Sequence, residues 1–207
     1  MYGGLSISKG KKNNTLAFVG TTSNDCTKIY SECKVGIKRK EEIPSDILNQ
    51  MFKNWAKTYF KKTDYVPDII ILYREGLSDA QVKIQVEPEI DALHYMINQI
   101  KVKTKQKNFK PEIYYLTVNK KINSRFYLED ERGKNKYLPR LLNPEPGSVI
   151  LDPMSKNDAY DFHLVPQRVT QGTCTPTHYT VAYARGKMPQ EALVTFTYEQ
   201  CYNYSNW

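Results

Sequence analysis

The stretch that most constrains the fold is residues 68–81, which read D-I-I-I-L-Y-R-E-G-L-S-D-A-Q. Four consecutive apolar residues, Ile69–Leu72, are followed at once by Y-R-E-G. A short aliphatic run of this kind is typical of a strand buried on both faces, and Gly76 permits a backbone turn that a residue with a Cβ resists. We therefore expect the Glu75 carboxylate at the carboxyl end of a central strand, where open α/β sheets bind their ligands. A polar strand exit without any chemistry is the alternative.

The composition favours a globular protein with a polyanionic partner. The chain of 207 residues suits one domain, or one domain plus a small appendage. Its contents of 40% hydrophobic and 25% charged residues are ordinary. Its formal net charge of +8 points most simply to nucleic acid, although many basic proteins bind none. No apolar run approaches the ~20 residues that span a bilayer, so no membrane partner is expected.

The four cysteines show no C-x-x-C pairing, which argues against both a zinc site and a disulfide framework. They are interpreted as reduced thiols, as in a cytoplasmic or nuclear protein.

Periodicity predicts an α/β fold with a mixed sheet flanked by helices. An antiparallel meander of three strands is expected over residues 1–8, 15–19 and 26–35. Further strands are expected at 69–72, 112–118, 148–152, 161–165 and 177–184, and helices are expected from Pro44-Ser45, over about 87–100, and from Pro189. His94 lies beside the apolar stripe of the second helix and is expected to be a packed histidine rather than a ligand. Residues 101–110 and 138–147 are expected to be loops.

Six blocks of sequence, in order and with plausible spacing, carry a family resemblance. They are C-T-K-I-Y-S-E-C, I-I-L-Y-R-E-G-L-S-D-A-Q, V-N-K-K-I-N-S-R-F-Y, N-P-E-P-G-S-V-I, Y-D-F-H-L-V and Q-G-T-C-T-P-T-H-Y. Together they resemble the PIWI domain of Argonaute proteins, and the first and last blocks lean toward the Piwi branch. The resemblance implies a ribonuclease H-like fold, a small guide RNA and its paired target RNA as partners, and a role in RNA-mediated gene silencing.

Members of this family that cleave the target share an Asp-Glu-Asp-His tetrad that binds two divalent metals. Here the resemblance places Ser6 at the first position, Glu42 (or Glu41) at the second and Glu75 at the third. The histidine would follow the last helix, beyond Trp207, so the chain is expected to be incomplete at its C-terminus. A neutral hydroxyl cannot replace a bridging carboxylate for Mg²⁺. No cofactor is therefore certain, and Mg²⁺ or Mn²⁺, with Glu75 as a ligand, is expected only if the chain is active.

The candidate nucleic-acid contacts are Lys120, Lys121, Arg125, Gln167, Arg168 and Thr175. The first three match basic positions that resemble the family's guide-backbone contacts. Gln167 and Arg168 stand where family members often show other polar residues near the seed of the guide, and Thr175 takes a position that is arginine in some relatives. Cations at strand ends suit phosphates, whose recognition is largely independent of sequence. A solvated rim without a partner is the alternative for each of these residues.

Three functions follow from these patterns. The first is an RNA-binding PIWI module that does not cleave, and the second is a metal-dependent endonuclease using Glu75, Glu42 and a further ligand. The third is a truncated product that only contacts a protein partner. Ser6 favours the first over the second, and the basic residues favour the first over the third. Exposed aromatic residues after the last helix, Tyr202, Tyr204 and Trp207, are expected to attract a protein partner.

Overall fold

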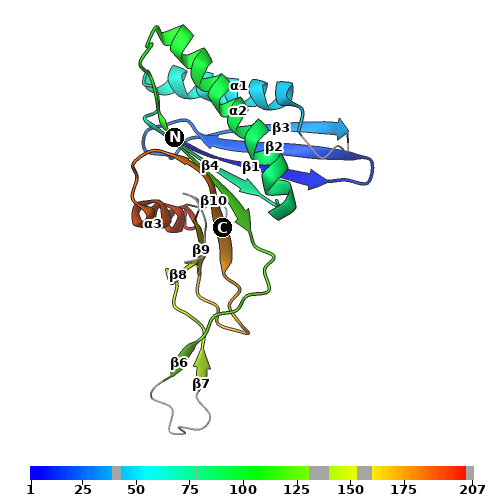
Figure 1. The fold of residues 1–207 in the computed structure, drawn as a ribbon, viewed down its shortest axis with the longest axis vertical. Helices are drawn as coiled ribbons and strands as arrows, with labels where there is room; N and C mark the ends of the chain where they lie inside the picture. Colours follow the sequence, from blue (N-terminus) through cyan, green and yellow to red (C-terminus); the bar gives the residue numbers. More distant parts are fainter. Residues whose placement is uncertain (39–42, 78, 131–139, 153–159, 204–207) are drawn as a thin grey trace. The chain divides into compact units, whose positions relative to one another are not determined.

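The computed structural model describes residues 1–38, 43–77, 79–130, 140–152 and 160–203. Its elements follow the chain from blue to red in Figure 1. In order they are β1 (Tyr2–Lys9), β2 (Asn13–Thr21), β3 (Ile29–Lys38), α1 (Ser45–Thr63), β4 (Ile69–Glu75), α2 (Asp79–Thr104), β5 (Glu112–Asn119), β6 (Leu128–Asp130), β7 (Arg140–Leu142), β8 (Val149–Asp152), β9 (Asp161–Leu164), β10 (Thr177–Arg185) and α3 (Gln190–Gln200).

The strands form a mixed sheet in the order β3-β2-β1-β4-β5-β10-β9-β8, and β6 pairs with β7 in a separate ribbon. This confirms the predicted α/β class and mixed sheet. The chain divides into two compact units, the first made of Met1–Val118 with Val181–Gly186 and the second of Asn119–Thr180 with Lys187–Trp207. A single domain over residues 1–207 stays a prediction.

Strand β4 is the central strand of the first unit, as the apolar run predicted. It pairs in parallel with β1 on one side and with β5 on the other. Its residues Ile70–Leu72 are buried, and Gly76 follows with a φ of +80°, the left-handed conformation that favours glycine. The β1–β2–β3 meander is antiparallel, also as predicted.

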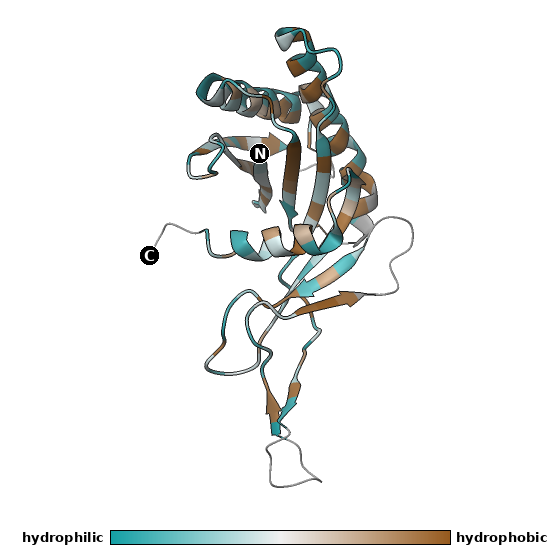
Figure 2. Cartoon of the chain, turned by 90° about the vertical axis from the view of Figure 1, so that its left-hand side faces the viewer, coloured by the Kyte–Doolittle hydropathy of each residue, from teal (hydrophilic) through white to brown (hydrophobic). Residues whose placement is uncertain are grey.

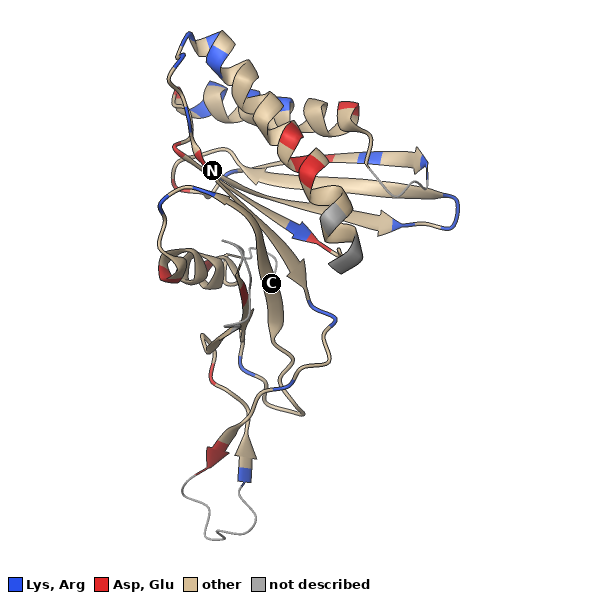
Figure 3. Cartoon of the chain, viewed as in Figure 1, with Lys and Arg blue, Asp and Glu red and all other residues tan. Residues whose placement is uncertain are grey.

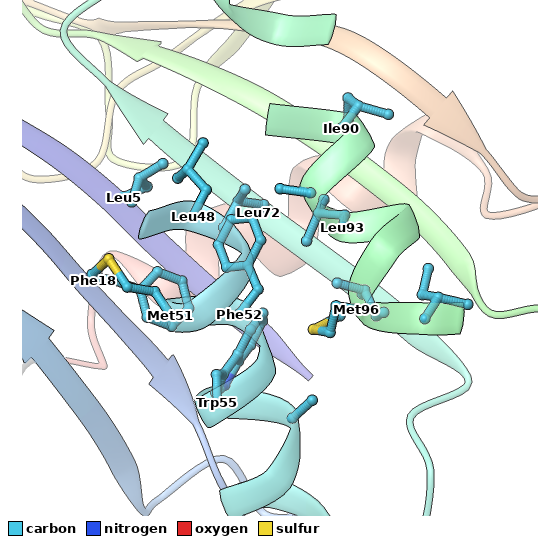
Figure 4. Close-up of a cluster of buried hydrophobic side chains, with 14 of the residues drawn as sticks. Leu5, Phe18, Leu48, Met51, Phe52, Trp55, Leu72, Ile90, Leu93 and Met96 are labelled. Atoms are coloured by element: carbon cyan, nitrogen blue, oxygen red, sulfur yellow. The ribbon is translucent and has the colours of Figure 1, made fainter. Parts of the chain in front are cut away.

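The core of the first unit lies between the sheet and the helices α1 and α2 (Figure 4). Helix α1 follows Pro44 and buries the predicted stripe, of which Phe52 and Trp55 are fully inaccessible. The ring of Phe18 in β2 packs edge-on against both, with centroid distances of 5.5 and 4.9 Å. A Cβ at Gly20 would lie 2.3 Å from Nε1 of Trp55, so the indole requires glycine at this position.

Several predicted element boundaries were wrong. Helix α2 begins at Asp79 rather than near Glu87, because it continues through Pro88 instead of starting there, and it ends at Thr104, inside the predicted lysine-rich loop. Strand β3 starts at Ile29 rather than Cys26, because residues 22–28 form a turn in which the Thr22 N–H donates to the Lys28 carbonyl at 2.7 Å. The predicted loop 138–147 contains β7, which is too short to show a period.

The second unit is built on β8, β9 and the first part of β10 (Thr177–Thr180), which pair antiparallel, and on α3. Phe162 of β9 and Tyr179 of β10 stack at 5.0 Å, and the Tyr179 hydroxyl lies 3.9 Å from Cys201 Sγ at the end of α3. Helix α3 carries both hydrophobic and hydrophilic positions (Figure 2). Among the described residues, no helix is long and apolar enough to cross a membrane.

Candidate functional site

Two of the predicted tetrad positions lie beside each other in the first unit. Ser6 is in β1, Glu75 ends β4, and these parallel strands align Leu5 with Arg74. The hydroxyl of Ser6 donates a hydrogen bond to Oε2 of Glu75 at 3.2 Å, and this pair is exposed. Glu41 and Glu42 lie outside the described residues. The structure therefore brings Ser6 and Glu75 together, and the role of Glu42 stays a prediction.

A buried polar network holds β4 at Arg74, the residue that precedes Glu75. Arg74 is 1% exposed, and its Nε donates to Oε1 of Glu89 in α2 at 2.9 Å. Its other nitrogens donate to the Gln85 side chain at 3.2 Å and to the backbone carbonyl of Glu75. Tyr115 of β5 completes the network with a 2.6 Å hydrogen bond to Oε2 of Glu89. Arg74 thus fixes the backbone that carries the Glu75 carboxylate.

The electrostatics of this network follow from its burial. Burial raises the pKa of the Glu89 carboxyl, while the Arg74 guanidinium opposes the rise. Burial also raises the pKa of Tyr115 well above its ordinary value. Figure 3 shows the charged positions at the end of β4 and on α2. The Arg74–Glu89–Gln85 network was not predicted from the sequence, although Gln85 and Glu89 are spaced i, i+4 and so share one face of a helix.

The predicted guide-contacting residues all lie in the second unit, and all are exposed: Lys120, Lys121, Arg125, Gln167, Arg168 and Thr175. The first three follow β5. The backbone N–H of Lys121 donates to Oδ1 of Asn119 at 3.0 Å, and Nη1 of Arg125 donates to the carbonyls of Ile122 and Ser124 at 2.9 and 2.8 Å. These bonds shape the segment so that it presents three cations to solvent.

Asn143 fixes the backbone of the segment 167–175. The Cys174 N–H donates to Oδ1 of Asn143 at 2.9 Å, and Nδ2 of Asn143 donates to the Gly172 carbonyl at 2.8 Å. The Tyr127 hydroxyl donates to Oγ1 of Thr173 at 3.4 Å, which links the two segments directly. Burial raises the pKa of the Cys174 thiol, and the nearby charge of Arg125 opposes the rise. The structure therefore brings the segments that carry Arg125 and Thr175 together.

The hydrogen bonds of Asn143 to Gly172 and Cys174 were not predicted from the sequence, although this residue opens the N-P-E-P-G block. We expect Asn143→Ala to lower the free energy of unfolding by about 1 kcal/mol, because the part-buried Cys174 N–H loses its acceptor and the exposed Gly172 carbonyl loses its donor. Urea denaturation measures the change. Asn143→Asp is the matched control: it keeps the acceptor for the Cys174 N–H but loses the donor to Gly172. An alanine variant as stable as the unchanged chain would contradict this account.

The family model of the Piwi domain matches residues 3–207 of this chain. The chain belongs to the Piwi domain family. Among curated relatives, it is 32% identical to Piwi-like protein Ago3 of Bombyx mori over 95% of this chain and 20% of the relative. It is 30% identical to Piwi-like protein 1 of Gallus gallus over 95% of this chain and 21% of that protein. The chain thus spans about a fifth of the curated relatives it matches.

Solved Argonaute and Piwi structures share the fold of this Piwi domain. The structure of Kluyveromyces polysporus Argonaute with a guide RNA matches 98% of this chain and 25% of its own, with a TM-score of 0.80 and 20% identity. The structure of Drosophila Piwi matches 99% of this chain and 27% of its own, with a TM-score of 0.70 and 24% identity. The predicted ribonuclease H-like fold is confirmed.

The two described tetrad positions, Ser6 and Glu75, do not by themselves supply the ligands of the two-metal site that the family resemblance implies. Two divalent ions need several anionic ligands close together, whereas Ser6 offers a neutral hydroxyl that is already bonded to Glu75. Across the described ranges, no group of three histidine, cysteine or acidic side chains is placed to hold a metal ion. The side chain of Asp79, a substitute ligand in principle, lies outside the described part of the chain.

Proposed function

We propose that this chain is an RNA-binding Piwi module that acts in small-RNA-guided gene silencing, with a small guide RNA and its paired target RNA as partners. The observation that carries the proposal is the convergence of two exposed segments in the second unit, which the Tyr127–Thr173 hydrogen bond links and of which Asn143 fixes the second. Their cations suit the phosphates of a nucleic-acid backbone. The solved Argonaute with the same fold was determined with a guide RNA, which supports this assignment.

The salt dependence of RNA binding tests this function. Each phosphate contact adds about 0.7 unit to the slope of log affinity against log salt concentration for a single strand. The triple variant Lys120→Ala/Lys121→Ala/Arg125→Ala is therefore expected to flatten the slope by about two units. Fluorescence anisotropy with a short single-stranded RNA, over a series of salt concentrations, measures it.

The matched control removes three lysines from the first unit, Lys103, Lys105 and Lys107, and keeps the same net charge as the triple variant. This control is expected to leave the slope close to that of the unchanged chain. An unchanged slope in the first variant, with a flattened slope in the control, would assign RNA binding to the region of Lys101–Lys110 instead.

We further propose that the chain does not cleave the paired target. Ser6 supplies no charge, and its hydroxyl occupies one oxygen of Glu75. Without a bound metal, the pKa of an attacking water stays near its high bulk value, so little hydroxide is available as a nucleophile. We expect no cleavage of a guide-paired RNA in Mg²⁺ or Mn²⁺ above the level of a Glu75→Ala control, as measured on a denaturing gel. Metal-dependent cleavage by the unchanged chain that Glu75→Ala abolishes would support a metal-dependent endonuclease.

We also propose that a protein partner binds at α3 and that the chain is located in the cytoplasm or the nucleus. Tyr202, just after α3, is 54% exposed, although its hydroxyl donates to the Pro166 carbonyl at 2.7 Å. Tyr204 and Trp207 lie outside the described residues. Exposed aromatic surface of this kind suits a protein contact.

A further inference from the structure

Three aromatic rings gather in the second unit outside the residues already discussed. His163 in β9 and His178 in β10 are directly paired in the sheet, and their rings stack with centroids 4.5 Å apart and planes 20° apart. Phe126 approaches His163 edge-on, with a centroid distance of 5.2 Å and an angle of 70°. We call Phe126, His163 and His178 the ring cluster.

The ring cluster lies on the face of the sheet that α3 does not cover. Side chains alternate between the two faces of a strand, so His163 and His178 point away from their neighbours Phe162 and Tyr179. Those neighbours are 0% and 7% exposed, on the side where Tyr179 meets Cys201 of α3. The rings of the cluster are instead only half-buried. A closed hydrophobic core would favour aliphatic side chains over histidine rings at positions 163 and 178.

The ring cluster is continuous with the cationic segment. Phe126 follows Arg125 in the chain, and Tyr127 then bonds to Thr173. A backbone that contacts Lys120, Lys121 and Arg125 would therefore bring its bases close to the cluster. Aromatic and imidazole rings bind unpaired bases by stacking. The pattern of cations beside rings is the one found in proteins that bind single strands.

The charges around the cluster favour a base over a phosphate as its ligand. Asp161 Oδ2 lies 3.4 Å from Nε2 of His178, and the Asp161 side chain is 29% exposed. A carboxylate at this position repels a phosphate, whereas it can accept a hydrogen bond from the amino group of a base. We propose that the ring cluster binds an unpaired RNA base by stacking. This inference rests on the proposed function of the chain as an RNA-binding module.

The experiment compares two RNAs of equal length and charge, a short single-stranded RNA and the same backbone without bases. Fluorescence anisotropy measures the affinity of the full chain for each. We expect His163→Leu/His178→Leu to weaken binding of the RNA with bases by about five- to a hundredfold, since stacking contributes that much for each base. Binding of the abasic RNA should be unchanged. The triple variant of Lys120, Lys121 and Arg125 should weaken the binding of both RNAs.

Two further results decide the inference. His163→Phe retains a ring for stacking and is expected to bind the RNA with bases about as well as the unchanged chain does, and this variant tests the inference even if the leucine variant fails to fold. Equal effects of the leucine variant on both RNAs, or a large loss of affinity in His163→Phe, would overturn the assignment of the ring cluster as a base site. Either result would leave the proposed RNA-binding function standing. Failure of the unchanged chain to bind either RNA would overturn the proposed function, and this inference with it.

Discussion

Arg74→Leu is expected to lower the free energy of unfolding by about 3–5 kcal/mol, the range typical when one partner of a buried ion pair is removed. The substitution leaves Glu89 buried without its cation and removes the hydrogen bond from Arg74 to Oε1 of Gln85. It also releases the backbone carbonyl of Glu75, so the Ser6–Glu75 pair should lose its geometry. Urea denaturation followed by circular dichroism measures the loss of stability.

The double variant Arg74→Leu/Glu89→Leu is the matched control. It removes both charges and replaces them with apolar side chains, so it should be more stable than Arg74→Leu alone, because no uncompensated charge stays buried. Tyr115 still loses its acceptor in this variant, and some destabilisation should persist. A double variant less stable than either single variant would contradict the claim that the uncompensated charge dominates.

Trp55→Ala is the second substitution with a large expected effect, again about 3–5 kcal/mol. Trp55 is fully inaccessible, packs edge-on against Phe18 at 4.9 Å and donates from Nε1 to the Thr21 carbonyl at 3.0 Å. Alanine would leave a cavity in the layer between α1 and the sheet and an acceptor without its donor. Thermal or urea denaturation of the variant measures the change.

Trp55→Phe separates the two contributions, since it keeps an aromatic ring but loses the hydrogen bond to Thr21. Its cost should therefore be clearly smaller than that of alanine. A Trp55→Phe variant as unstable as Trp55→Ala would show that the hydrogen bond, not the packing, dominates at this position.

The sequence by itself determined the main elements, because their signals are local. The unbroken run Ile69–Leu72 predicted the central strand β4, and the apolar stripe around Phe52 and Trp55 predicted α1. These patterns repeat at the period of a strand or helix, so they can be recognised without knowing what lies across the core. The six sequence blocks likewise predicted the fold, and the resemblance to the Piwi family is confirmed. Predicted element boundaries were wrong where the chain does not follow a local rule. Proline usually lies at the start of a helix, but Pro88 lies inside α2.

Only the tertiary structure decided which side chains meet. The Ser6–Glu75 and Arg74–Glu89 contacts depend on parallel pairing of β1 with β4 and on the packing of α2 against the sheet. Asn143 reaches Cys174 across many residues of chain, and the His163–His178 stack exists only because β9 and β10 pair in one register. A shift of one residue would send one of the two rings to the other face. No period along the chain encodes such register, since it is set by the combined packing of distant segments.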